Sequence, residues 1–137
     1  MFVFGLLAMT ISQGLAKNNK ENMEQYLPDV FQMGQITYTS GGIGLEERGA
    51  LEATAKQYNL IISNAGKHGE FTAGTTIVIT GKDHQQLLNV SDAGPLLYVK
   101  LPPGPYVITA SNRDEKAERT ISITGQQQAR MFFTWSD

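Results

Sequence analysis

The first stretch whose residues could do chemistry is SGGIGLEERGALE, residues 40–52, in which a glycine-rich segment runs into an acidic one. A glycine-rich loop before a helix can bind an anion, because the N–H groups at a helix start have no partner within the helix. Phosphate-binding loops usually supply a lysine as well, and this stretch has none. Its acids Glu46 and Glu47 would repel an anion, but they suit the positive end of a helix dipole.

The stretch therefore predicts a helix start, with Gly44 as an acceptable N-cap. A small hydrolase that uses Glu46 and Glu47 is an alternative. However, adjacent helical residues point about 100° apart, whereas hydrolytic carboxylates face a shared cleft about 5–9 Å apart. A direct contact with a ligand or partner is the other alternative, and the residues that would make it are Ser40, Gly41, Gly42, Gly44, Glu46 and Glu47.

Other residue types that commonly carry chemistry do not form a recognisable set. His68 and His84 precede and follow a predicted strand, so we expect them at its opposite ends. Neither belongs to an HxH, HExxH or EF-hand pattern, and no serine occupies a GxSxG elbow. The 137 residues include no cysteine. We therefore expect no catalytic residue, no metal site and no cofactor.

Aromatic residues could bind a sugar if a row of them were exposed. Trp135, the only tryptophan, shares its strand face with other apolar residues, which favours a place in the core. Tyr98 lies on the face opposite Leu97 and Val99, so both faces of its strand are apolar. Such a strand is covered by a helix or presents a contact surface. We expect helix cover, and contact by Tyr98 is the alternative.

The elements that must position these residues are mostly strands. Residues 45–58 predict a helix with Leu51, Ala55 and Tyr58 on one stripe, and residues 35–40 predict a short strand. From residue 59 onward the pattern has period 2 and is interrupted by turn residues, as in an antiparallel sandwich. The seven predicted strands lie within residues 59–66, 75–82, 86–92, 95–101, 105–112, 117–125 and 128–135.

Composition limits the classes of function. Eleven basic and 13 acidic side chains give a net charge of −2 without a basic cluster, which disfavours nucleic acid as a partner. Residues 2–11 form a largely apolar run that is too short to span a bilayer, and small residues follow at positions 14 and 16. This pattern predicts a signal peptide over residues 1–16. We expect a flexible lead-in over residues 17–34 and a single domain over residues 35–137, with no membrane span in the mature chain.

Residues 94–111, GPLLYVKLPPGPYVITAS, resemble the hallmark of carboxypeptidase regulatory-like domains, which are transthyretin-like (prealbumin-like) β-sandwiches. Two prolines and a glycine allow the chain to reverse sharply in this turn. The SGGIG loop and the following helix also look like small exported proteobacterial proteins without an assigned activity. The resemblance covers roughly residues 59–135 and assigns a structural turn to Leu101, Pro102, Pro103, Gly104 and Tyr106.

The resemblance implies a mainly β fold, a seven-stranded antiparallel β-sandwich with one N-terminal helix packed on it. Domains of this type accompany enzymes as non-catalytic modules. Together with the leader, this predicts an exported, periplasmic or secreted binding module of the bacterial cell envelope, whose partner is an envelope protein or a glycan. A structural or assembly subunit that pairs through a sheet edge is the alternative from another class.

Overall fold

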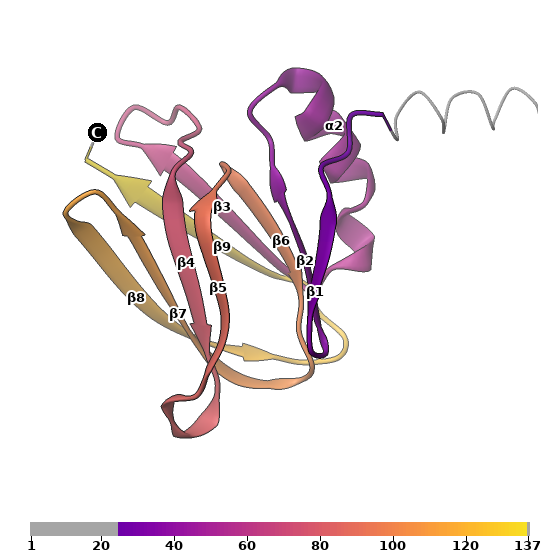
Figure 1. Ribbon diagram of the computed structural model, residues 1–137, viewed down its shortest axis with the longest axis vertical. Helices are drawn as coiled ribbons and strands as arrows, with labels where there is room; N and C mark the ends of the chain where they lie inside the picture. Colours follow the sequence, from indigo (N-terminus) through magenta and orange to yellow (C-terminus); the bar gives the residue numbers. More distant parts are fainter. Residues whose placement is uncertain (1–24, 137) are drawn as a thin grey trace, which may run out of the picture.

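The computed structural model describes residues 25–136, in which two β-sheets and one α-helix form a mainly β structure (Figure 1). The predicted signal peptide, residues 1–16, and residues 17–24 of the predicted lead-in lie outside the described residues. In chain order the elements are β1 (Val30–Met33), β2 (Ile36–Gly41), α2 (Leu45–Ala53), η1 (Ala55–Gln57), β3 (Leu60–Gly66), β4 (Thr75–Thr80), η2 (Lys82–His84), β5 (Gln86–Ala93), β6 (Leu96–Lys100), β7 (Gly104–Asn112), β8 (Glu115–Ile123) and β9 (Ala129–Trp135).

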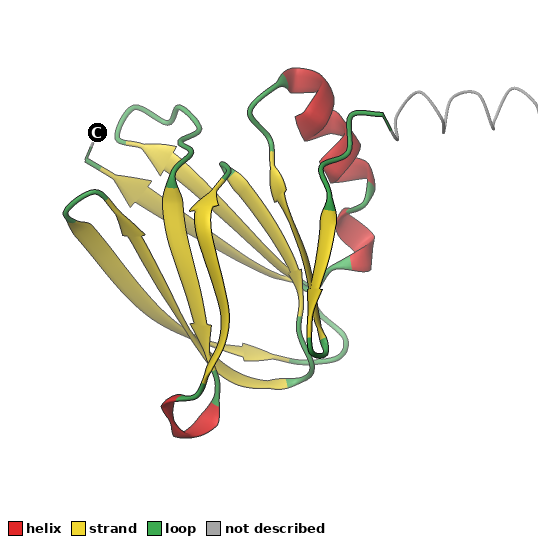
Figure 2. Cartoon of the chain, viewed as in Figure 1, coloured by secondary structure: helices red, strands yellow, loops and turns green. Residues whose placement is uncertain are grey.

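The sheets pack face to face in a sandwich-like arrangement (Figure 2). The five-stranded sheet has the order β1-β2-β6-β3-β9, and the four-stranded sheet has the order β5-β4-β7-β8. Alternation along each strand supplies the core between them. In β9, for example, Met131, Phe133 and Trp135 are buried while the residues between them are exposed. Burying each large apolar side chain contributes roughly 1.5–3 kcal/mol, and the predicted core position of Trp135 is confirmed.

The expected count of seven strands is wrong, because the described residues form nine. The predicted strand segments correspond to β2 through β9, and the additional strand β1 lies within the segment expected to be a flexible lead-in. Gly34 and Gln35 join β1 to β2 in a hairpin. Gly34 has a φ of +60°, which a type II′ turn requires at its first central residue. The last part of this segment therefore forms a strand.

The expectation of a purely antiparallel arrangement is also wrong, since β3 and β9 pair in parallel. These are the first and last of the seven strands predicted after the helix. Parallel neighbours need a long connection, and here the chain forms the five strands β4 to β8 between them. The other strand pairs are antiparallel.

The LPPGPY turn carries the chain from one sheet to the other, because β6 and β7 belong to different sheets. Gly104 has a φ of +151°, a backbone conformation that favours glycine. The Tyr106 hydroxyl donates to the carbonyl oxygen of Pro102 at 2.6 Å. The side-chain amide of Asn59 bonds the backbone N and O of Leu101 at 2.9 and 2.8 Å. These bonds fix the turn from both sides.

The α-helix α2 is shorter than predicted, because it ends at Ala53 and the 3₁₀ turn η1 follows. The side-chain amide of Gln128 donates to the carbonyl oxygens of Ala55 and Tyr58 at 2.8 and 3.0 Å, so it satisfies acceptors at the end of this helical segment. The predicted apolar stripe packs on the outer face of the five-stranded sheet. The buried cluster there consists of Leu51, Tyr58, Ile61, Leu96 and Tyr98.

Candidate functional site

The SGGIG loop is held by contacts within the protein. Glu47 reaches back from the first turn of α2 and accepts a hydrogen bond from the backbone N–H of Gly42. Arg48 donates from Nε and Nη2 to the carbonyl oxygen of Gly42 at 3.3 and 3.2 Å. The Ser40 hydroxyl accepts a hydrogen bond from the N–H of Gly94 at 2.7 Å. The loop is therefore a structural connection, in which the Glu47 carboxylate already has a partner.

Close packing explains two glycines near this loop, against backbone at Gly94 and against side chains at Gly41. A Cβ on Gly94 would stand 2.8 Å from the carbonyl oxygen of Gly41 and 2.9 Å from its Cα. A Cβ on Gly41 would collide with the Glu47 carboxylate. Gly44 is the N-cap of α2, without a side-chain cap, and Glu46 lies exposed in the first turn. These residues form the helix start that the sequence predicted.

Tyr98 lies beneath the helix and is 3% exposed. Its ring meets the ring of Tyr58 edge-on, with 5.7 Å between the centroids. The prediction that a helix covers Tyr98 is thus confirmed for its ring. Tyr98 also lines the main candidate site, which is a groove between α2 and the edge strand β9.

This groove is a cavity of about 410 Å³ on the outer face of the five-stranded sheet. It combines two charged side chains of opposite sign with hydroxyl groups and an aromatic ring. The lining residues are Glu52, Ala55, Ile61, Ser63, Phe71, Leu96, Tyr98 and Arg130. Small-molecule sites are usually mostly apolar with a few polar groups, and this groove is more polar than that, because half of its lining residues are charged or carry a hydroxyl.

Strand register explains how the floor of the groove is assembled. One row across the sheet contains Tyr98, Ile61 and Arg130. The next row contains Leu96, Ser63 and Phe132. Paired residues point to the same face, and neighbouring strands are about 4.8 Å apart. The floor is therefore roughly 10 Å wide from β6 to β9, with the Ser63 hydroxyl near its centre.

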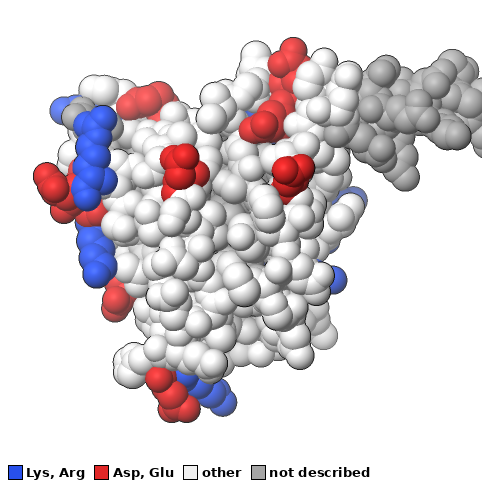
Figure 3. Space-filling model, viewed as in Figure 1, with Lys and Arg blue, Asp and Glu red and all other residues white. Residues whose placement is uncertain are grey.

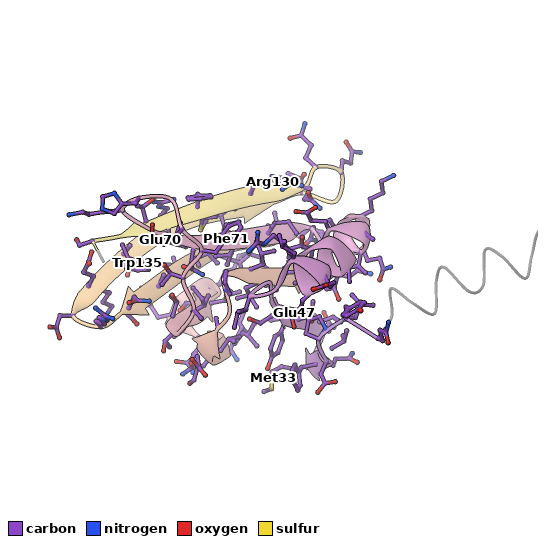
Figure 4. All side chains as sticks on the ribbon, turned by 90° about the horizontal axis from the view of Figure 1, so that it is seen from above. Met33, Glu47, Glu70, Phe71, Arg130 and Trp135 are labelled. Carbon is purple, nitrogen blue, oxygen red and sulfur yellow. The ribbon has the colours of Figure 1, made fainter. Side chains whose placement is uncertain are left out.

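Besides Tyr98, the Phe71 ring lines the groove, and Phe132 lies beside the lining residue Ser63 in the sheet. Phe71 lies in the long connection between β3 and β4, where it forms an isolated bridge with Ala65. The Arg48 guanidinium carbon lies 4.3 Å from the centre of the Phe71 ring, so the SGGIG loop indirectly positions this wall. Phe71 is 38% exposed, and Phe132 beside Ser63 is 52% exposed. Figure 4 shows Arg130 on β9 and Phe71 between that strand and the helix.

Both charges of the groove act on the Tyr98 hydroxyl. Burial raises the pKa of Tyr98 above its ordinary value, and the Glu52 carboxylate raises it further. The Arg130 guanidinium acts in the opposite direction and lowers this pKa. The hydroxyl therefore remains protonated at neutral pH, and it can both donate and accept a hydrogen bond.

Other candidate sites are less developed. A second cavity of about 360 Å³ is lined mainly by the polar 124–128 connection, in which Gln128 is tied to the helix end. His68 and His84 lie before and after β4, near opposite ends of that strand, as expected. Across residues 25–136, no group of three or more His, Asp or Glu side chains could hold a metal ion. Within the same residues, every helix is too short or too polar to cross a membrane.

Comparison with known proteins finds no match, either among protein-family models or among curated proteins. The candidate site therefore stands on its geometry. It brings Tyr98 together with Glu52, Ser63, Phe71 and Arg130, but the SGGIG residues lie outside the groove lining. The sequence analysis did not select Arg130 or Phe132 as site residues. Both could have been recognised as outward-facing, because they alternate with the core residues of β9.

Proposed function

We propose that the protein is an exported, non-catalytic binding module of the bacterial cell envelope, and that the groove between α2 and β9 binds an uncharged glycan. The observation that carries this proposal is that Glu52 and Arg130 line the same groove as the Tyr98 hydroxyl. A carboxylate accepts hydrogen bonds only, and a guanidinium donates them only. A sugar has hydroxyl groups that do both, so neighbouring hydroxyls can satisfy the two groups together.

The same charges disfavour other small ligands. Glu52 would repel an anion, whereas Arg130 and the nearby Arg48 would repel a cation. The exposed rings of Phe71 and Phe132 add apolar surface for the C–H face of a sugar ring. Ser63 and Tyr98 contribute further hydroxyls near the floor. An uncharged polyhydroxylated ligand matches these features better than a free anion or amine.

The proposal assigns no reaction to Glu46 or Glu47. Glu47 accepts the Gly42 N–H, and its role in fixing the loop accounts for its position. The resemblance of residues 94–111 to carboxypeptidase regulatory-like domains supports a non-catalytic role, because such domains accompany enzymes as accessory modules. A prealbumin-like relationship and export through the predicted leader are parts of the same proposal.

Titration calorimetry with uncharged oligosaccharides of glucose, galactose and N-acetylglucosamine tests this function, with sulfated oligosaccharides as the anionic comparison. We expect saturable binding of at least one uncharged oligosaccharide. Arg130→Ala and Phe132→Ala each remove an exposed anchor and should weaken binding about tenfold or more. Tyr26→Ala is the matched control, since Tyr26 is an exposed aromatic residue that does not line the groove.

Circular dichroism of each variant shows whether its fold is retained. The proposal is wrong if the sulfated sugars bind better than the uncharged ones. It is also wrong if folded Arg130→Ala and Phe132→Ala proteins bind as tightly as the unmodified chain, or if none of the uncharged oligosaccharides binds.

A further inference from the structure

β1 is an edge strand whose apolar side chains remain exposed. It pairs with β2 on one side and ends the order of the five-stranded sheet, so no described strand pairs with its other side. Phe31 is 50% exposed, Met33 55% and Val30 59%. The strand VFQM contains no charged residue and no proline. Unprotected apolar edges of this kind are sites where another strand can add.

The other three edge strands carry features that discourage strand addition. At the β9 edge, Arg119 donates to the carbonyl oxygen of Phe132 at 2.7 Å and lies over the Phe133 ring. β8 contains four charged residues, and the pairing of β5 with β4 has two register shifts. Charges and bulges are common protections of sheet edges. Among the described strands, β1 is the edge that lacks them.

The turn between β1 and β2 determines which backbone groups of β1 point outward. In a two-residue hairpin the flanking pair, here Met33 and Ile36, exchanges hydrogen bonds, and the pattern alternates along the strands. Phe31 therefore bonds to Tyr38, while the N–H and C=O of Gln32 point away from β2. We propose that β1 pairs antiparallel with β1 of a second copy, so that two five-stranded sheets join across a twofold axis at Gln32.

This register is self-complementary. The two Gln32 residues exchange their outward N–H and C=O groups as one hydrogen-bonded pair. Phe31 of each copy lies opposite Met33 of the other, on the face that carries the core. Aromatic rings and thioether sulfur make favourable contacts. Because β1 has no charge, the two copies bring no like charges together at the seam. A twofold interface needs this kind of self-matching surface.

A cavity beside β1, whose lining combines apolar residues with Gln35, Gln85 and Gln86, offers space for the second copy. It has a volume of about 420 Å³, and its lining includes Met33, Ile36, Leu87 and Tyr106. Phe31 of the second copy lies beside Met33, at the mouth of this cavity. Figure 3 shows the side of the molecule where β1 and β5 face the viewer: its lower middle is uncharged, Asp and Glu lie across its upper half, and Lys and Arg lie at its rim. This surface is separate from the glycan groove, which borders the opposite edge strand.

Sedimentation equilibrium of the purified protein tests the pairing. We expect a dimer that dissociates with dilution. Phe31→Lys places like charges at the seam, and Gln32→Pro removes an outward N–H without removing a bond to β2. Each should raise the dissociation constant about tenfold or more. Ile43→Lys makes the same apolar-to-lysine change at an exposed loop residue and should leave the dimer unchanged.

A cysteine introduced into this cysteine-free chain tests the register. Across the proposed axis the two Gln32 Cα atoms stand about 5.5 Å apart, within the range that a disulfide can bridge. Gln32→Cys should therefore form a crosslinked dimer under mild oxidation. The two Val30 residues would lie about 13 Å apart along the strands, so Val30→Cys should remain uncrosslinked. A monomeric unmodified protein at about 100 µM, or equal crosslinking of both variants, would overturn the proposal.

Discussion

At the scale of single residues, the glycines of this chain have different structural roles, and the space around each glycine indicates its role. Gly94 packs directly on the backbone of Gly41, so its lack of a side chain is a steric requirement. Gly49 lies inside α2, where an added Cβ would meet nothing within 4 Å, so its lack of a side chain only weakens the helix.

Alanine at these two glycines should therefore change stability in opposite directions. Gly94→Ala places a methyl group against backbone that cannot move easily, and we expect it to lower the free energy of unfolding by about 1–3 kcal/mol. Gly49→Ala should raise it by about 0.5–1 kcal/mol through helix propensity. Urea denaturation measures both. Equal stability of the two variants would contradict this account of the loop.

The buried tyrosines predict how stability depends on pH. Burial raises the pKa of Tyr58, Tyr98 and Tyr106 in the folded protein. The unfolded chain therefore loses these protons first, and stability that is complete below about pH 10 falls as the pH rises further. Thermal unfolding between about pH 8 and 11 should show this fall. Tyr98→Phe should make it shallower, and an unchanged profile would contradict the assigned environment of Tyr98.

At the scale of elements, α2 forms one wall of the groove because its apolar stripe docks on the outer face of the sheet. Leu51 is fully buried in this contact, together with Tyr58 and the sheet residues Ile61, Leu96 and Tyr98. A helix of this length is marginal without tertiary packing. The position of Glu52 over the groove therefore depends on Leu51.

Truncation of Leu51 tests this dependence. Leu51→Ala should lower the free energy of unfolding by about 2–5 kcal/mol, since it leaves a cavity under the helix. Phe132→Ala removes an exposed side chain from the same face and should change stability by less than about 0.5 kcal/mol. Guanidinium denaturation of the two variants provides the comparison. Similar losses in both would show that α2 is not anchored in this way.

At the scale of the whole molecule, period-2 alternation was sufficient to predict the strands that build the core. It could not reveal β1, because VFQM has no alternation, although the Gly34-Gln35 pair was a hairpin signal. The parallel pairing of β3 with β9 joins segments far apart in the chain, and local pattern carries no information about such pairs. Ser63 and Phe71 enter the groove through this long-range arrangement, which explains why sequence reasoning missed them.

The central claim is that an uncharged glycan binds between α2 and β9, and residue-resolved NMR titration tests it most directly. On addition of the oligosaccharide that binds in calorimetry, we predict saturable shifts of the backbone amides of Ser63, Phe71 and Arg130. Amides of β5, on the other sheet, should remain unchanged. Shifts confined to β5 or to the SGGIG loop, with the groove amides unmoved, would contradict the claim.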